Sequence, residues 1–312
     1  MSKFLLQRSI SLLFVLFSLT FITFMVGHLV PGDPIQVLMG PRRDPETYAR
    51  LRHLYGLDQP LVIQYLRYVG GLLRGDFGLS FRYAERPVRE LIAQGVPISI
   101  GVGGLALLLS VFVGVPLGVV TALRQNTVFD RVVIALTLLL YAVPSFVLIP
   151  ILWLLNLRLY QAGINTLPQA GWGTPQHLVL PVLVLAAANI GYIARLTRSS
   201  MLEVLREDFV RTARSKGLQE RIVVVRHVLR NALLPILTLL GPATAALVTG
   251  AFVVENLFSI PGIGRISIEA IGQRDYPVIM GTTVILGTAV VVLNTLTDVL
   301  YRVFDPRIEL GE

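Results

Sequence analysis

The sequence predicts an all-α integral membrane protein with six transmembrane helices. Of its 312 residues, 54% are hydrophobic and only 15% are charged, and the apolar residues form long uninterrupted runs. Soluble domains carry about 25% charged residues, so this chain is too poor in charge to be one. A transmembrane barrel would instead show alternating segments of about ten residues, whereas the long runs suit helices that satisfy their own backbone hydrogen bonds.

The first apolar run is residues 9–30, and a short basic tail of residues 1–8 precedes it. A cleaved signal peptide is the alternative, but its apolar core would be about 7–15 residues long and would lead to a small-residue cleavage site. Here the run leads instead to Pro31-Gly32-Asp33-Pro34. We therefore expect an uncleaved first transmembrane helix.

A long polar connection, residues 31–96, follows the first span. Asp44-Pro45 is typical of a helix N-cap and first helical residue, and Asp58-Gln59-Pro60 gives a second helix signal. Beyond it, one helical face collects Leu61, Tyr65, Leu66, Val69, Leu72 and Leu73. We expect two short amphipathic helices on or near the membrane, because a structureless loop of this length would be unusual.

Five further apolar runs lie within a membrane core of residues 97–312. Each is long enough, as a helix, to cross a hydrocarbon layer of about 30 Å. The second run has Gly114 and Gly118 at a spacing that permits close helix contact. The third has Pro144 and Pro150 inside it. The runs are residues 97–123, 132–157, 178–194, 233–254 and 277–297.

The distribution of positive charge predicts the topology. Residues 195–230 carry nine Lys/Arg, and both tails and residues 124–131 carry two each, whereas the short loops 158–177 and 255–276 carry one and two. The connection of residues 31–96 is long enough to be translocated across the membrane whatever its charge. Both termini and the basic stretch are therefore expected in the cytoplasm. The same rule accounts for the net charge of +8, so we expect a lipid bilayer and no nucleic acid as partner.

Several chemistries are excluded by residues that the sequence lacks. The six runs contain no Asp, Glu, Lys or Arg, which argues against a proton- or sodium-driven carrier. There is no cysteine, no H-E-x-x-H and no P-loop, so we expect no catalytic residue, no metal site and no ATP site of that kind on this chain. Polar residues in the runs suit helix packing or a polar pathway, for which Asn189, Thr249 and Thr283 are candidates.

The cytoplasmic loop 195–232 carries a pattern beyond its charge. Residues 201–216 are good helix formers, with Met201, Leu202, Leu205 and Phe209 at helical spacing, and Gly217 then ends the helix. A helical pattern resumes over 219–229, with Ile222, Val225 and Leu229 about a turn apart. We predict a helix–glycine–helix elbow that serves as a docking surface. The alternative is a loop whose charge only fixes topology.

Motifs along the chain support a family resemblance. They are DFVRTARSKGL (208–218), LRNALLP (229–235), HLVPGDP (28–34), YGLDQPL (55–61), GDFGLS (75–80), FSIPGIGR (258–265), RDYPV (274–278) and DPRI (305–308). In this order and at these spacings, they resemble the inner-membrane permeases of ABC importers in the dipeptide/oligopeptide/nickel group, specifically the first of two permease subunits. Arg211-Thr212-Ala213 stands where the general importer pattern has Glu-Ala-Ala, and Pro235 lies 18 residues past Gly217 rather than 13. The peptide-type group is similar in both respects.

The resemblance implies a type I ABC-importer permease with a cytoplasmic coupling helix and a long outer loop after the first span. It implies a bacterial cytoplasmic (inner) membrane location and a heterodimer with a second homologous permease. Further implied partners are two cytoplasmic ATPase subunits, which would bind ATP and Mg, and an extracytoplasmic solute-binding protein. This chain would be no enzyme and would bind no cofactor. The expected cargo is di- or oligopeptides, with nickel chelates, glutathione or another small solute as alternatives, and an ATP-independent channel or carrier as a further one.

The resemblance also implies roles for individual residues. ATPase motion would enter around residues 203–217, through Glu207, Asp208, Phe209, Arg211, Thr212, Ala213, Arg214, Lys216 and Gly217. A turn between the last two spans would contact the binding protein through Ser259, Ile260, Pro261, Gly262, Ile263 and Gly264. The alternative for this segment is a re-entrant turn that closes the fifth and sixth spans.

Overall fold

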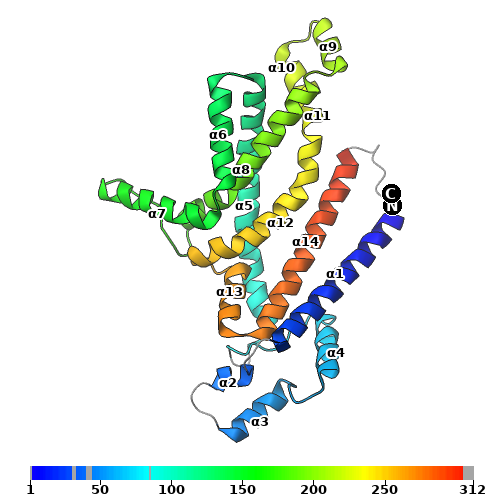
Figure 1. Ribbon diagram of the computed structural model, residues 1–312, viewed down its shortest axis with the longest axis vertical. Coiled ribbons are helices and arrows are strands. Elements are labelled where there is room, and N and C mark those ends of the chain that lie inside the picture. The colour runs from blue at the N-terminus through cyan, green and yellow to red at the C-terminus, as the bar shows by residue number, and fades with distance from the viewer. Residues whose placement is uncertain (1, 30–32, 40–43, 84–85, 305–312) are drawn as a thin grey trace. The chain divides into compact units, whose positions relative to one another are not determined.

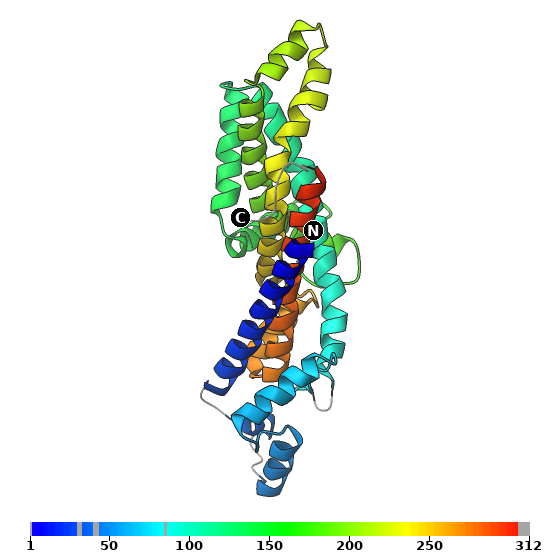
Figure 2. The same ribbon diagram turned by 90° about the vertical axis from the view of Figure 1, so that its right-hand side faces the viewer.

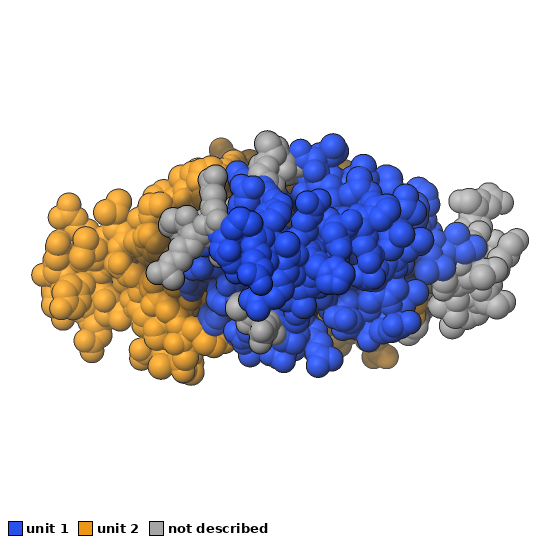
Figure 3. Space-filling model, turned by 90° about the horizontal axis from the view of Figure 1, so that it is seen from below, with its two compact units in different colours: residues 1–99, 261–291 blue, residues 100–260, 292–312 orange. Residues whose placement is uncertain are grey.

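The computed structural model describes residues 2–29, 33–39, 44–83 and 86–304, and these residues are mostly helical (Figure 1). The described residues contain no strand, only an isolated bridge between Leu79 and Pro87. The chain forms two compact units, coloured separately in Figure 3. Unit 1 comprises residues 1–99 and 261–291, and unit 2 comprises residues 100–260 and 292–312. The all-α fold class is confirmed.

Unit 1 contains helix α1, Ser2–Leu29, which includes residues 2–8 of the expected tail. The connection after it holds three helices rather than two: α2 (Pro34–Met39), α3 (Pro45–Leu54) and α4 (Leu61–Leu72). Unit 1 also contains the first part of α5 (Val88–Leu123), α13 (Ile263–Gln273) and the first part of α14 (Tyr276–Phe304).

Both predicted helix starts in this connection are followed by a helix, but only the first is capped by a side chain. The first is confirmed, because the Asp44 carboxylate accepts the backbone N–H groups of Glu46 and Thr47, with a proline at the start of α3. The second is followed by α4, which begins directly after Pro60 but has no side-chain cap. The Asp58 carboxylate lies 2.8 Å from His53 Nδ1.

Helix α4 packs along the C-terminal half of α1 (Figure 1). The Tyr65 hydroxyl lies 3.1 Å from Thr20 Oγ1, and the Phe24 ring lies 5.3 Å from the Tyr65 ring. Thr20 is nine residues before the end of α1, about 14 Å along the helix axis. Helix α4 therefore lies at the depth of the first span, where its exposed Val62 and Leu66 suit contact with lipid.

The core of unit 1 joins the start of α5 to α13 and α14. A Cβ at Gly281 of α14 would lie 2.9 Å from a Val88 methyl carbon, so the two helices meet closely at this glycine. The buried residues of this cluster are Val88, Leu91, Ile92, Ile263, Ala270 and Val278.

Unit 2 is built on three helices that lie side by side: the rest of α5, α6 (Val128–Ala142) and α8 (Gln176–Val204) (Figures 1 and 2). A Cβ at Gly118 of α5 would lie 2.5 Å from the carbonyl oxygen of Ala194, and a Cβ at Gly114 would lie 3.0 Å from Ile193. The close contact predicted from the two glycines is confirmed. The remaining long helices of unit 2 are α7 (Ser145–Gln161) and α12 (Leu234–Leu257).

The expected spans are matched in part. Within the described residues, α1, α5, α8 and α14 are long and apolar enough to cross a membrane. The span expected at 132–157 is not one straight helix: α6 and α7, which occupy this run, meet at an angle of 110° and form either a broken span or a re-entrant loop. Pro144 causes this break, since a residue before proline is driven out of the helical region, and Val143 is extended. Helix α12 occupies the position of the fifth run, and the total of six spans stays a prediction.

Candidate functional site

The candidate coupling segment forms a hairpin at the end of α8, seen at the top of Figure 1. Its elements are α9 (Asp208–Ser215), α10 (Glu220–Ile222), the π-helix η1 (Val223–Leu229) and α11 (Arg230–Ala232). The single helix expected over 201–216 is wrong. The chain turns after Val204, and Glu207 takes an extended conformation that starts α9 in a new direction.

One face of α9 is anchored in an apolar cluster. Val210 is fully buried and Ala213 is 6% exposed. Both belong to a cluster that draws residues from α5, α8, η1 and α11, namely Ala122, Met201, Val223, Val224, Val228 and Ala232. Because the cluster is continuous, a displacement of α9 is expected to move these helices with it.

The opposite face of α9 is open to solvent. The side chains of Asp208 and Arg211 are 95% and 75% exposed, and they form only a loose ion pair of 3.4 Å. Phe209 beside them is an exposed aromatic residue, and Thr212 and Lys216 are also exposed. An exposed aromatic side chain among charges is typical of a protein-binding surface.

A glycine and an ion pair close the hairpin. Gly217 has φ = +73°, and its N–H donates to the Arg214 carbonyl at 2.9 Å, so the predicted helix stop is confirmed. The Arg214 guanidinium then binds the Glu220 carboxylate through two hydrogen bonds of 2.7 and 3.1 Å. This guanidinium lowers the pKa of Glu220, and the carboxylate raises the pKa of Arg214.

The returning segment follows the predicted pattern only in part. Leu229 packs against the apolar cluster, whereas Ile222 and Val225 are exposed and Val223, Val224 and Val228 are buried. Residues 223–229 form a π-helix, in which residues i and i+5 pair, so that the side-chain positions rotate relative to an α-helix. No residue type in this stretch distinguishes a π-helix from an α-helix, so the sequence could not reveal it.

An ion pair that the sequence did not predict ties α6 to α8. Asp130 is buried and accepts two hydrogen bonds of 2.8 Å from Arg198. The Asn126 N–H donates to the same carboxylate at 3.0 Å, and Thr127 caps α6 through the Asp130 N–H. The sequence Thr127-x-x-Asp130 is typical of a helix start and could have indicated the N-terminus of α6. The pairing of Asp130 with Arg198 could not be predicted, because 68 residues separate them.

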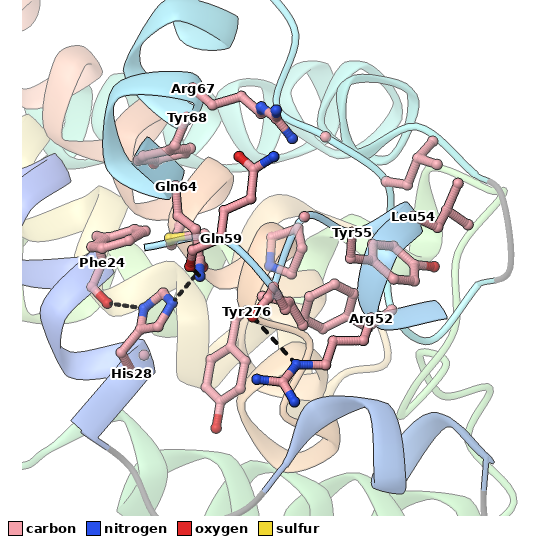
Figure 4. Close-up of a pocket in the computed structure, with 18 of the residues that line it drawn as sticks. Phe24, His28, Arg52, Leu54, Tyr55, Gln59, Gln64, Arg67, Tyr68 and Tyr276 are labelled. Carbon is pink, nitrogen blue, oxygen red and sulfur yellow. Dashed lines mark hydrogen bonds between the residues drawn. The ribbon is translucent and has the colours of Figure 1, made fainter. Parts of the chain in front are cut away.

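The described residues 33–39 and 44–83, which belong to the predicted outer loop and are called the outer connection below, line a cavity of about 720 Å³ in unit 1 (Figure 4). Its walls come from α1, α3, α4 and the start of α14, and they mix aromatic and polar side chains. Within the described part of the chain, three buried polar atoms of the wall have no hydrogen-bond partner: Gln59 Oε1 and the hydroxyl groups of Tyr68 and Tyr276. A cavity of this size with unpaired polar atoms can hold a small molecule or a segment of a partner protein. The labelled lining residues are Phe24, His28, Arg52, Leu54, Tyr55, Gln59, Gln64, Arg67, Tyr68 and Tyr276.

Asp275 holds part of this connection in place. Its buried carboxylate accepts the backbone N–H groups of Phe81 and Arg82, at 3.1 and 3.2 Å, and the Ser80 hydroxyl. Nearly 200 residues separate Asp275 from these partners. Sequence reasoning singled out the RDYPV motif but gave this carboxylate no role.

The candidate binding-protein contacts fall on either side of the boundary between the units, with Ser259 and Ile260 in unit 2 and the rest in unit 1. Ile263 lies in the core of unit 1, and its N–H donates to Ser99 Oγ at 2.9 Å. Gly262 and Gly264 are buried, and Pro261 is exposed. The contacts in unit 1 favour a packed turn, and the contact role stays a prediction.

The three pathway candidates are not brought together by any described contact. Asn189 and Thr283 each donate a hydrogen bond to a carbonyl of their own helix, at 3.2 and 2.7 Å. The side chain of Thr249 lies outside the described residues.

Comparisons with known proteins agree with this architecture. Residues 114–310 match a family model described as binding-protein-dependent transport system inner membrane component, and residues 1–89 match the model of the N-terminal part of such membrane components. The chain is 38% identical to the dipeptide transport system permease protein DppB of Bacillus subtilis over 99% of both chains, and 41% identical to DppB of Lactococcus lactis over 99% of this chain and 100% of that one. It is 39% identical to the oligopeptide transport system permease protein OppB of Escherichia coli K12 over 99% of both. Among solved structures, a chain of the methionine ABC transporter MetNI in inward-facing conformations matches with a TM-score of 0.56 and 18% identity, over 69% of this chain and 96% of that one.

Proposed function

Because the chain belongs to the family of binding-protein-dependent transport system inner membrane components, and is thus a multi-pass permease subunit of an ABC importer, we propose that it imports di- or oligopeptides and receives ATPase motion through α9. The observation that carries the cargo is the identity of 38–41% to dipeptide and oligopeptide permeases over essentially the full chain. The alternatives, a nickel chelate, glutathione or another small solute, would use the same scaffold.

The proposed coupling step uses the two faces of α9. The exposed face, with Phe209 and Arg211, docks on a cytoplasmic ATPase subunit that binds ATP and Mg. The buried face, with Val210 and Ala213, passes the displacement to α5, α8 and η1 through the shared apolar cluster. Nucleotide-driven closure of the ATPases thereby shifts the population between inward- and outward-facing states.

The proposed assembly has this chain beside a second homologous permease, with two ATPase subunits on the cytoplasmic side and both termini of this chain in the cytoplasm. A solute-binding protein docks on the other side. The cavity lined by Gln59, Arg67 and Tyr276 is the part of the outer connection that we propose for this contact, since its unpaired polar atoms are suited to hydrogen bonds from a partner.

The coupling proposal is tested at Gly217, where only a positive φ closes the hairpin. Proline has φ near −65° and cannot take this conformation, whereas asparagine tolerates it. In the complete importer in proteoliposomes, we expect Gly217→Pro to abolish dipeptide uptake and substrate-stimulated ATP hydrolysis, with membrane insertion intact. The matched Gly217→Asn variant should retain most of both activities.

Normal uptake by the Gly217→Pro importer would refute the coupling role. The cargo is tested in the same vesicles, where labelled dipeptide should accumulate only with ATP inside. Uptake without the ATPases would instead support an ATP-independent channel or carrier.

A further inference from the structure

Two arginines one turn apart on α8 are held in different ways. Arg198 forms the bidentate ion pair with buried Asp130. The Arg195 guanidinium lies over the Tyr141 ring, 4.9 Å from its centroid. Its buried Nε has no hydrogen-bond partner among the residues that the structure describes, and no acid pairs with it there. Arg195 is therefore a cation whose ionic partner is missing from the described chain.

The guanidinium of Arg195 lies deep along α6. Asp130 is near the start of α6, and Tyr141 lies 11 residues later, about 16 Å along the axis. Side chains on a helix lean towards its N-terminus, so Arg195 extends away from α9 and towards the middle of the candidate span Gln176–Val204. Tyr192, one turn before Arg195, stacks on the same Tyr141 ring at 6.0 Å.

A charged side chain at such a depth is costly in lipid. It is found facing a bundle interior or a water-filled cavity, with an anionic partner or on a substrate pathway. The nearest described acid of α6, Asp130, is already engaged by Arg198. Among the residues that the structure describes, no fixed acid is therefore available to Arg195, and a partner that reaches it from outside this chain, such as a transient anion, is required.

We propose that Arg195, flanked by Tyr141 and Tyr192, binds the C-terminal carboxylate of the peptide cargo during its passage. A planar guanidinium can bind a carboxylate through two parallel hydrogen bonds while one of its faces stacks on an aromatic ring. A peptide carries such a carboxylate at its C-terminus, and it binds and leaves during each transport cycle. A transient ligand of this kind suits an arginine that has no acid paired with it among the described residues. This inference rests on the proposed peptide function.

The test measures whether Arg195 and the cargo carboxylate are energetically coupled. The complex of both permeases and the ATPases, in detergent and without binding protein, is titrated with a labelled dipeptide and with the same dipeptide as its C-terminal amide. We expect the unmodified complex to bind the free carboxylate about tenfold or more tightly than the amide. In Arg195→Gln the two forms should bind equally, and Arg195→Lys should restore part of the preference.

Arg158→Gln is the matched control, because it removes an exposed arginine of α7 from the same unit and should keep the preference of the unmodified complex. An equal preference in the unmodified and Arg195→Gln complexes would overturn the proposal, as expected if an acid of the second permease or a lipid phosphate occupies Arg195. The proposal would also be overturned if the unmodified complex bound neither the dipeptide nor its C-terminal amide. If the complete importer also fails to take up the dipeptide, the peptide function falls with it, whereas normal uptake would leave that function standing.

Discussion

The hairpin of residues 205–232 and the outer connection of residues 33–39 and 44–83 are both folded without long helices of their own, but different interactions hold them. In the hairpin, apolar side chains such as Val210 enter a cluster whose other members come from neighbouring helices. In the outer connection, α4 packs its Tyr65 ring on α1, but the segments on either side of α4 are held by polar groups: Asp275 accepts two backbone N–H groups, and Tyr48 donates its hydroxyl hydrogen to Asp33. Apolar packing thus holds the hairpin, whereas directed hydrogen bonds hold the outer connection outside α4.

This difference fits the tasks proposed for the two regions. A close-packed apolar anchor resists compression and is suited to transmitting displacement from one helix to the next. Hydrogen bonds around a cavity instead define a shape and leave polar atoms available for a partner, as at Gln59 and Tyr276. The comparison therefore predicts that a charge introduced into the apolar cluster detaches the hairpin from its neighbouring helices. It also predicts that removal of one hydrogen-bond acceptor makes the outer connection more mobile.

The largest effect is expected from Val210→Asp. Val210 is fully buried among apolar side chains, so a carboxylate there would lack any partner and would cost about 3 kcal/mol or more. We expect α9 to detach from its cluster, with loss of substrate-stimulated ATP hydrolysis in the reconstituted importer. Limited proteolysis should cut the hairpin faster than in the unmodified chain.

Thr212→Asp is the control for this change, because Thr212 lies on the exposed face of the same helix and a carboxylate there stays in water. Its proteolysis rate should remain close to that of the unmodified chain. Equal cleavage of the two variants would show that packing of Val210 does not hold α9.

A smaller effect is expected from Asp275→Ala in unit 1. The change leaves the Phe81 N–H without its acceptor and removes one of the two acceptors of the Arg82 N–H, which keeps Ser80 Oγ, at a cost of about 2 kcal/mol. Hydrogen exchange of the amides around residues 80–83 should accelerate. Asp76→Ala is the matched control, since this exposed carboxylate only caps Gly78, and it should have little effect. Unchanged exchange in Asp275→Ala would refute the idea that directed hydrogen bonds hold the outer connection.

The same contrast explains which features could be predicted from the sequence. Gly217, Asp44-Pro45 and the Gly114/Gly118 pair act through local backbone geometry or residue size, and each was predicted in its observed role. The apolar residues Val210 and Ala213 mark the face of α9 that is buried. The direction of α9 depends on the turn at residues 205–207, and no residue type there indicates that the helix ends. The family motifs at residues 208–218 and 229–235 indicate where the hairpin lies in the chain, but not its conformation.

The features that could not be predicted depend on distant partners. The pairs Asp130–Arg198 and Asp275–Phe81 join residues 68 and 194 positions apart, and no periodicity connects them. Proline is also ambiguous, because Pro144 ends α6 whereas Pro150 lies inside α7. Arg195 shows the same limit, since it reads as the first charge of a cytoplasmic loop until its contact with Tyr141 places its guanidinium within the span.

The smallest effect concerns the ion pair that closes the hairpin, and it tests whether charge adds to packing there. Arg214 lowers the pKa of Glu220, so the carboxylate contributes stability above the ordinary glutamate value of 4.5, and this contribution is lost as the pH falls through the lower folded value. Both side chains are largely exposed, and solvent limits the pair to about 0.5 kcal/mol. Glu220→Gln should therefore speed hydrogen exchange of α9 slightly near neutral pH, and the difference from the unmodified chain should vanish in acid, where Glu220 is itself neutral. A difference that persists in acid would mean that shape rather than charge at Glu220 closes the hairpin.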